Sequence, residues 1–227
     1  MLTSFEKLPK FLKNKKVKKY YDLLRKKRVY LFLKRLFDIF ASLILLILLT
    51  PVFLILAIMI KLDTKGPVFY RQERVTKYGK IFRIFKFRTM IVDADKKGNL
   101  VTTTEDDRIT KVGKKIRNSR LDEIPQLINI LIGDMSFVGT RPEVKKYVDR
   151  YTDEMLATLL MPAGVTSRAS INFRDEAKIM DEYLNKKMSL DDVYVKKILP
   201  EKMKYNLEYL KKCSIIEDIK LCIKTII

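Results

Sequence analysis

A run of 22 residues without a charged side chain, residues 39–60, places the strongest constraint on how this chain folds. As one continuous α-helix it would be about 33 Å long, enough to cross a bilayer core of about 30 Å. Pro51 interrupts the run near its middle, where it removes a helical hydrogen bond and clashes with the preceding turn. The run therefore combines the composition of a membrane helix with a built-in break.

Both flanks of this run are basic. Residues 1–35 contain thirteen Lys or Arg, and residues 61–90 contain nine. A single span would place one of these flanks outside, against the positive-inside rule. A re-entrant helix that turns near Thr50-Pro51 and returns to the same face removes the conflict, so we favour it slightly over a kinked span. The hydroxyls of Ser42 and Thr50 are candidates to bond the carbonyls that the break releases.

Two basic residues directly precede the apolar run. Lys34 and Arg35 are expected to meet lipid phosphates, although ordinary snorkelling anchors would explain them as well. Residues 1–30 are densely basic with scattered aromatic side chains, which is typical of an interfacial amphipathic helix or of a disordered basic tail. We therefore expect a basic extension (1–30), a re-entrant anchor (31–62) and a cytoplasmic domain (63–227).

The charge balance of the chain favours an anionic partner. Lys and Arg number 47 against 27 Asp and Glu, which gives a formal charge of +20. The absence of histidine excludes His-based triads and most zinc sites. No helix-turn-helix, RRM or zinc-finger pattern supports nucleic-acid binding. The two cysteines, Cys213 and Cys222, form no CxxC motif and are interpreted as reduced thiols.

After the apolar run the pattern predicts an α+β domain that is mostly helical. The segments "VFYRQER" and "KIFRIFKFR", on either side of Tyr78-Gly79, predict a short β-hairpin. Its basic residues could line an anion site, but a solvated basic face is the more common explanation. Helices are predicted over 108–118, from about Asp122 to Gly133, over 175–188, over 191–212 with a break near Pro200, and over an amphipathic C-terminal end that packs on the domain or lies on the membrane.

Two adjacent carboxylates, Asp122 and Glu123, stand out in so basic a chain. Acidic residues at a helix N-terminus complement the helix dipole, and Ser119 or Asp122 could simply cap the helix. The same position would keep a carboxylate ionised, and an ionised Asp can attack phosphorus. A carboxylate pair also suits Mg2+ bound together with substrate phosphates. Three nearby arginines are suited to bind phosphate: Arg117, Arg120 and Arg141.

Taken in order, these motifs make the chain similar to the bacterial sugar transferase family, the monotopic polyprenyl-phosphate phosphoglycosyl transferases. The resemblance spans about residues 29–227. The matching segments are "KRLFD", the break at Pro51, "GPVFYRQERV", "IFRIFKFRTM", "RNSRLDEIPQLINILIGDMSFVGTRPE", "MPAGVTSRASINFRDE" and the C-terminal "YVKKILPEKMKYNLEYLKKCSIIEDIKLCIKT".

The resemblance implies an enzyme that transfers a sugar 1-phosphate from a UDP-sugar to undecaprenyl phosphate and releases UMP, which starts a bacterial surface polysaccharide or glycoconjugate. It implies that Asp122 is the nucleophile beside Mg2+, that a covalent aspartyl-phosphosugar forms, and that Glu123 supports the metal or proton chemistry. Arg117, Arg141 and Arg174 would contact phosphate. The family's re-entrant anchor would hold the protein on lipids at the cytoplasmic face of the inner membrane. A homodimer stays open, and a non-catalytic membrane adaptor is the alternative function.

The chain departs from the family pattern at four places. The common Ser-Pro at the break is Thr50-Pro51, and the loop usually written GPRP reads GTRP at 139–142. Thr76 stands where a glycine is usual before the second strand. The segment usually written PGITGWAQVNGR reads "PAGVTSRASINFR", with Ala163 inserted. Sugar or nucleotide preference is expected to differ with this last segment.

Overall fold

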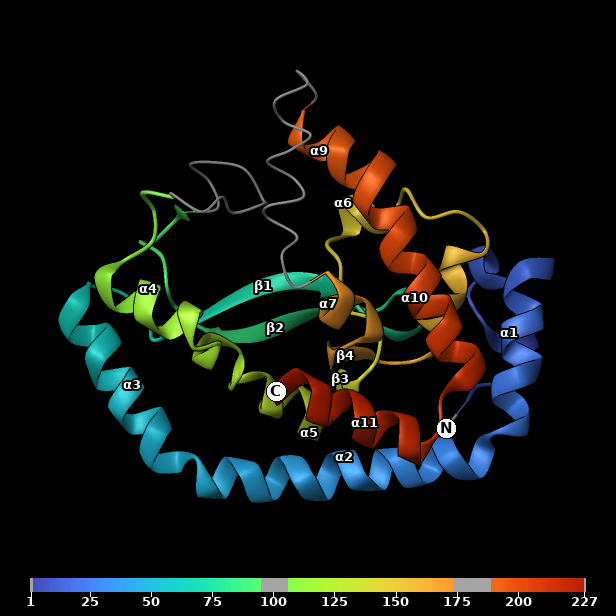
Figure 1. Cartoon of the computed structure of the whole chain (residues 1–227), viewed down its shortest axis with the longest axis horizontal. Coiled ribbons are helices and arrows are strands. Elements are labelled where there is room, and N and C mark those ends of the chain that lie inside the picture. Colours follow the sequence, from blue (N-terminus) through green and yellow to red (C-terminus); the bar gives the residue numbers. More distant parts are fainter. Residues whose placement is uncertain (1, 95–105, 174–188, 227) are drawn as a thin grey trace.

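The fold is known from a computed structural model that describes residues 2–94, 106–173 and 189–226. Within these ranges the chain is mostly helical and has two small two-stranded sheets, which confirms the predicted α+β class. A long helix lies across the base, helices rise at both of its ends, and the remaining elements pack above it (Figure 1). The predicted helix 175–188 and Arg174 lie outside the described residues.

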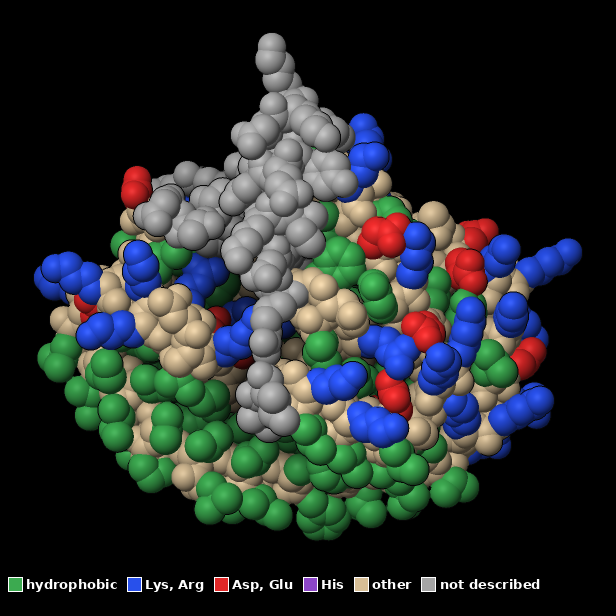
Figure 2. All heavy atoms as spheres, viewed as in Figure 1, with side chains coloured by type: hydrophobic (Ala, Val, Ile, Leu, Met, Phe, Trp, Pro, Cys, Tyr) green, Lys and Arg blue, Asp and Glu red, His purple; other side chains and the backbone are tan. Residues whose placement is uncertain are grey.

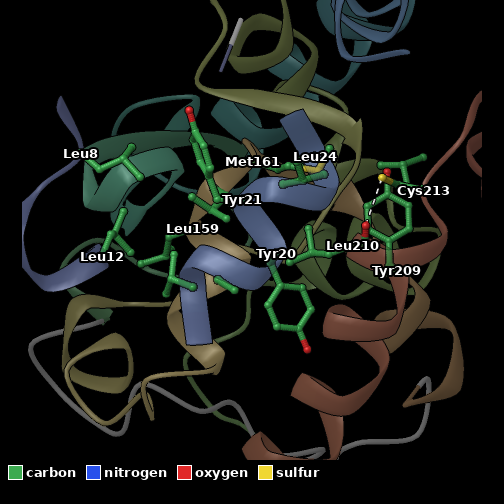
Figure 3. Packing of buried hydrophobic residues seen from close by; sticks show 14 of the residues in the cluster. Leu8, Leu12, Tyr20, Tyr21, Leu24, Leu159, Met161, Tyr209, Leu210 and Cys213 are labelled. Carbon is green, nitrogen blue, oxygen red and sulfur yellow. Dashed lines mark hydrogen bonds between the residues drawn. The ribbon is translucent and has the colours of Figure 1, made fainter. Parts of the chain in front are cut away.

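The N-terminal residues are part of the main hydrophobic core. Two 3-10 turns, η1 (Phe5–Lys7) and η2 (Lys10–Leu12), lead into α1 (Lys15–Lys26). Asn14 caps α1, because its side-chain oxygen accepts from the amide of Val17 at 2.8 Å. The apolar side of α1 is buried in a cluster with residues from 159–161 and from 209–213, and Figure 3 labels ten of its members: Leu8, Leu12, Tyr20, Tyr21, Leu24, Leu159, Met161, Tyr209, Leu210 and Cys213.

This packing differs from both expectations for residues 1–30. An interfacial helix would turn its apolar stripe to lipid, and a disordered tail would bury nothing. Instead Val17 and Leu24 are fully buried within the protein, while lysines such as Lys15, Lys16 and Lys19 are exposed. The charge density of the segment suggested a solvated tail, but its apolar residues repeat at helical spacing and pack against α10 (Leu199–Lys212).

The predicted break in the apolar run is present. The chain direction bends by 61° between helix α2 (Arg28–Leu48) and helix α3 (Thr50–Asp63). Pro51 lies in the first turn of α3, where its missing N–H group is tolerated. The Thr50 hydroxyl donates to the carbonyl of Leu46 at 2.9 Å, as predicted for a carbonyl near the break. Ser42 instead bonds the Asp38 carbonyl, away from the break.

No single helix among the described residues is long and apolar enough to cross a membrane. The bent pair α2 and α3 together passes that test by length and composition. Leu56 and Ile60 of α3 are buried against Phe87 and Ile116 of the globular domain. The chain therefore returns to the same body after the bend.

One side of α2 carries a buried polar stripe of Lys34, Asp38 and Ser42, which repeat every four residues. Lys34 forms an ion pair with Asp218 at 2.7 Å. The Asp38 carboxylate accepts from the hydroxyl of Ser136 and the amide of Phe137, both at 3.1 Å. This stripe holds α2 on the globular domain.

Lys34 and Arg35 are thus placed differently from the expected lipid contacts. Lys34 is only 7% exposed and its ammonium faces Asp218. The guanidinium of Arg35 donates to the carbonyls of Ile130 and Leu131, at 2.6 and 2.8 Å, at the end of a neighbouring helix. Both cations satisfy buried or partly buried acceptors of the protein itself, because α2 lies along the domain instead of pointing away from it.

The predicted hairpin is confirmed. Strands β1 (Phe69–Val75) and β2 (Ile81–Phe87) pair antiparallel, with Phe69 opposite Phe87. Tyr78 and Gly79 both have positive φ, 60° and 78°, and make the turn. Phe82 and Ile84 are buried against the next helical layer.

A second sheet was not predicted. Strands β3 (Met135–Val138) and β4 (Ala163–Thr166) pair parallel. Gly139 and Gly164 allow their backbones to approach closely, since a Cβ on Gly164 would lie 2.1 Å from the Gly139 nitrogen. The other elements are α4 (Lys111–Asn118), α5 (Gln126–Ile132), α6 (Lys145–Val148), η6 (Met155–Leu160), α7 (Arg168–Asn172), α9 (Leu190–Val193), a π turn (Tyr194–Ile198), α10 (Leu199–Lys212) and α11 (Ile215–Ile226).

The C-terminal helix α11 uses both of its faces. Leu221 is buried in the main core, whereas Ile215, Ile216, Ile219 and Ile223 are exposed. These exposed residues continue the apolar surface of α2 and α3, which forms the lower edge of the molecule in Figure 2. Core packing, one of the two alternatives for this helix, is confirmed for the side that carries Leu221, and contact of the opposite side with the membrane stays a prediction.

Candidate active site

The acidic pair lies on a short 3-10 turn, Leu121–Glu123, and not at the start of an α-helix. Arg120 adopts a left-handed conformation (φ 53°) that ends α4. The predicted helix start at Asp122 is therefore wrong, because α5 begins only at Gln126. The cause is Pro125: it has no N–H to bond the carbonyl of Leu121, and the amide of Ile124 closes a tighter turn there at 3.3 Å.

Glu123 is held by two cations. Both terminal nitrogens of Arg141 contact its carboxylate, one of them 3.3 Å from Oε2. The Nζ atom of Lys86 donates to Oε1 at 2.8 Å. Burial by itself would raise the pKa of Glu123, but Arg141 and Lys86 together hold it well below its usual value. Glu123 is therefore an ionised anchor for these two side chains.

Asp122 has a different environment one residue earlier. The Nζ atom of Lys86 lies 3.9 Å from Oδ2 of Asp122. Burial raises the pKa of Asp122, and the charge of Glu123 adds to this rise against the opposing effects of Lys86, Arg117 and Arg141. The expected helix dipole is missing from this turn, so it is the surrounding cations that favour the ionised form.

The two carboxylates face two different cavities. Asp122 lines a cavity of about 390 Å³ beside the hairpin. This cavity is strongly basic, with cations contributed by β1, by β2 and the residue after it, by α4 and by the segment before α4: Arg71, Arg74, Lys86, Arg88, Arg108 and Arg117.

Glu123 and Arg141 line the second cavity, of about 610 Å³. Its apolar wall includes Leu45 and Leu49, which lie at the bend between α2 and α3. Cations and hydroxyl groups line it as well: Arg120, Lys224, Ser119, Thr166, Ser170 and Thr225. The acidic turn thus separates a basic cavity from one that reaches the apolar bend.

Several predicted site residues come together around this turn. Arg141 contacts Glu123, and Arg117 lines the same cavity as Asp122. Arg174 lies outside the described residues. Sequence reasoning did not single out Lys86, although the alternation Phe82, Ile84, Lys86 along β2 places it on the buried side of the strand and could have identified it.

The predicted Mg2+ fits the chemistry at Asp122 in part. Mg2+ prefers oxygen ligands and is commonly bound by one or two carboxylates together with substrate phosphates. Asp122 presents such a carboxylate to the basic cavity, whereas the oxygens of Glu123 are already engaged by Arg141 and Lys86. Within the described ranges, no cluster of three or more His, Cys, Asp or Glu is placed to hold a metal. The residues present therefore suit an ion that is completed by substrate.

Comparison with known proteins places the chain in a family. Residues 29–227 match the model of the bacterial sugar transferase family. A Bacillus subtilis protein whose name describes an undecaprenyl-phosphate N-acetylgalactosaminyl 1-phosphate transferase is 42% identical over 135 residues, which cover 60% of this chain and 75% of the relative. The UDP-N-acetylgalactosamine-undecaprenyl-phosphate N-acetylgalactosaminephosphotransferase of Aeromonas hydrophila is 35% identical over 202 residues, 87% of this chain and 44% of the relative.

A third relative is the UDP-glucose:undecaprenyl-phosphate glucose-1-phosphate transferase of Klebsiella pneumoniae. It is 34% identical over 197 residues, which cover 85% of this chain and 39% of the relative. The chain thus spans less than half the length of the second and third relatives. The chain belongs to the bacterial sugar transferase family, and it is a transferase.

Proposed function

We propose that the protein transfers a sugar 1-phosphate from a UDP-sugar to undecaprenyl phosphate. The observation that carries this proposal is the acidic turn between two cavities of different character. By their names, the Aeromonas hydrophila and Klebsiella pneumoniae relatives use undecaprenyl phosphate as the acceptor and a UDP-sugar as the donor. A two-substrate transfer at one acidic centre is the chemistry that suits this arrangement. We also propose that it starts a bacterial surface polysaccharide or glycoconjugate.

The basic cavity is proposed to take the UDP-sugar. Its volume of about 390 Å³ is in the range of small-molecule sites. A diphosphate carries several negative charges, and the arginines and lysine around Asp122 offer complementary charge and forked donors. Arg117 lines this cavity with Asp122 and would contact the phosphate next to it, and Arg71 lines the cavity from β1.

The second cavity is proposed to take undecaprenyl phosphate. This acceptor is an amphiphile, with a charged phosphate and a long hydrocarbon chain. Leu45 and Leu49 would contact the chain where it leaves the membrane, and Arg141 and Lys224 would meet the phosphate. The acceptor would then reach the acidic turn from the side opposite to the donor.

In the proposed reaction, the Asp122 carboxylate attacks the sugar-bearing phosphorus of the donor. The bond from that phosphorus to the bridging oxygen breaks, and UMP leaves with the electron pair. A phosphate oxygen of the acceptor then attacks the same phosphorus, and the Asp122 carboxylate is released. Arg141 and Lys86 keep Glu123 ionised beside it. Bound Mg2+ would neutralise charge on the diphosphate.

The apolar lower edge supports the proposal that α2 and α3 enter the membrane as a re-entrant anchor. Exposed large apolar side chains gather on α2 and α3 and continue onto α11 (Figure 2). Such a continuous patch on a soluble surface is unusual. With both ends of the bent pair attached to one globular body, the catalytic domain would lie on the cytoplasmic face of the bacterial inner membrane.

The test is UMP release from a panel of UDP-sugars by the purified protein with undecaprenyl phosphate and Mg2+. Variants at two exposed positions test which cavity binds the donor and which binds the acceptor. Arg71→Gln should raise the KM for the donor about tenfold, and Arg83→Gln, exposed on the same hairpin but outside the cavity, should not. Lys224→Glu should raise the KM for the acceptor by a similar factor, and Lys220→Glu on the same helix should not.

Two results of this assay would contradict parts of the proposal. Well-folded protein that releases no UMP with any donor would refute the transfer reaction and favour a non-catalytic adaptor. Release without any selective effect of Arg71→Gln or Lys224→Glu would keep the reaction and refute the assignment of the cavities.

A further inference from the structure

A buried charged cluster lies outside the two cavities. It consists of Glu143, Tyr194 and Lys202, whose exposed fractions are 8%, 4% and 5%. The Tyr194 hydroxyl donates to Oε1 of Glu143. The ammonium of Lys202 donates to the Tyr194 oxygen at 3.1 Å and lies 3.6 Å from the same carboxylate oxygen. A buried ion pair is weak evidence for stability, because desolvation offsets its attraction. Its position in the fold suggests another role.

The cluster joins the C-terminal helices to the loop that carries Arg141. Glu143 follows Arg141 by two residues, in the connection between β3 and α6. Lys202 belongs to α10, and Tyr194 opens the π turn that precedes it. Such π turns are rare in proteins, and those that occur often lie at functional sites. The side chains of Arg141 and Glu143 thus connect one short loop to two different partners, the acidic turn and α10.

This loop, residues 139–144, has no helix or strand of its own, so its position depends on the bonds at its edges. The amide of Gly139 donates to the Thr166 carbonyl at 3.0 Å. The amide of Val75 donates to the Glu143 carbonyl at 2.9 Å, and Arg74 donates to the Pro142 carbonyl at 3.2 Å. These bonds fix the loop to β1 and β4. Two contacts connect it to the C-terminal layer: the buried Glu143 carboxylate, and the side chain of Val144, which packs in one cluster with Tyr194 and Met203.

We propose a positioning role for Glu143, Tyr194 and Lys202. They hold the Arg141 side chain on the Glu123 carboxylate and so affect the rate of the reaction, although they lie outside the two cavities. The inference rests on the proposed transfer function. Lys202 and Tyr194 line neither of the two cavities beside the acidic pair, and Glu143 connects them to the loop. Removal of the Lys202 charge would leave the Glu143 carboxylate buried without its ion-pair partner, with only the electrostatic attraction of Arg74 to offset its charge. The loop would then shift toward water, and a displacement of about 1 Å at a reacting group can cost about 100-fold in rate.

The kinetic test uses Lys202→Met, Glu143→Gln and the double variant. We expect Lys202→Met to lower kcat about 30-fold, with a KM for the donor that changes less than threefold. The double variant should recover most of this loss, because the carboxylate and its ion-pair partner are removed together. Lys204→Met is the matched control: Lys204 lies on the same helix in an exposed pair with Glu201, and its loss should leave kcat unchanged.

A double-mutant cycle separates positioning from simple destabilisation. In an Arg141→Lys background the two-nitrogen contact of the guanidinium with Glu123 is already lost. Lys202→Met should therefore lower kcat by less than threefold in that background. An equal loss of kcat in both backgrounds would overturn the proposal. So would a Lys202→Met variant that melts at a lower temperature but keeps its kcat.

Amide hydrogen exchange tests the same idea without turnover. In Lys202→Met the amides of Val75 and Gly139, which bond across the loop, should exchange at least tenfold faster, and Glu143→Gln should restore them in the double variant. The amide of Leu31, which donates to the Lys27 carbonyl at the start of α2, serves as the reference. Unchanged exchange at Val75 and Gly139, or equal acceleration at all three amides, would refute the positioning role. If the wild-type protein releases no UMP, the proposed function fails, yet this exchange experiment still decides the role of Lys202.

Discussion

Both terminal nitrogens of the Arg141 guanidinium donate to the Glu123 carboxylate. Lys86 approaches the same carboxylate at 2.8 Å, so one acidic side chain organises two basic ones. Asp122, the adjacent residue, faces the basic cavity instead. Two carboxylates next to each other in sequence therefore have opposite pKa shifts, and this difference yields separate predictions for each.

Glu123→Gln should destabilise the protein by about 2 kcal/mol at pH 7, the range for charged hydrogen bonds. Because the pKa of Glu123 is lowered on folding, its stabilisation is present above its usual pKa and is lost as pH falls through the lowered value. The difference between wild type and variant should therefore shrink on acidification. Urea unfolding at pH 7 and at pH 4 measures it, with the exposed Glu201→Gln as control. A constant difference across this range would contradict the assignment.

Asp122→Asn should raise the melting temperature at pH 7. The pKa of Asp122 is raised on folding, so its favourable contribution is present below its usual pKa and is lost as pH rises through the raised value. At neutral pH the ionised carboxylate opposes folding, and the amide removes that penalty while it removes activity. Thermal unfolding with and without Mg2+ checks this. Asp149→Asn, in an exposed ion pair, should show no gain. An equal or lower melting temperature for Asp122→Asn would be the contrary result.

Lys34→Met should cost about 3 kcal/mol of stability, because it leaves Asp218 buried without its cation. Lys34→Met combined with Asp218→Asn should recover most of that loss. Binding to vesicles that contain anionic lipid should not change, since the Lys34 ammonium faces the protein. Lys18→Met, from an exposed pair, should cost less than about 1 kcal/mol. Lost vesicle binding with unchanged stability would restore the original lipid-phosphate interpretation.

The re-entrant anchor predicts that residues before α2 and after α3 lie on the same side of the membrane. Lys19→Cys and Lys65→Cys, both at exposed positions, should react with a membrane-impermeant maleimide only after the inner membrane of spheroplasts is opened. The background for both is a variant with serine at positions 213 and 222. Labelling of one position in intact spheroplasts, and of the other only after lysis, would show a spanning helix.

The elements that were predicted well depend on local signals. The hairpin follows from two alternating segments around Tyr78-Gly79, and the bend follows from Pro51. The acidic pair was singled out because two carboxylates are conspicuous in a basic chain. In each case the determining residues lie within a few positions of each other.

The elements that were missed depend on contacts between distant residues. Strands β3 and β4 have four residues each and pair across a separation in sequence that no local pattern encodes. The burial of α1 requires α10, from the other end of the chain. Lys34 was misplaced because its partner, Asp218, is equally distant. The start of α5 was misplaced for a local reason: Pro125 is tolerated in the first turn of a helix, but here it follows a 3-10 turn that the Ile124 amide closes.

The most direct test of the central claim is to trap the intermediate on Asp122. Protein is mixed with a UDP-sugar labelled in its sugar-bearing phosphate, without acceptor, and is quenched in acid for peptide mass spectrometry. We predict one labelled sugar phosphate per active site on the peptide that contains Asp122. Undecaprenyl phosphate should remove this label, and Asp122→Asn should carry none. UMP release that strictly requires the acceptor, with no label on the protein, or label on a different residue, would contradict the central claim.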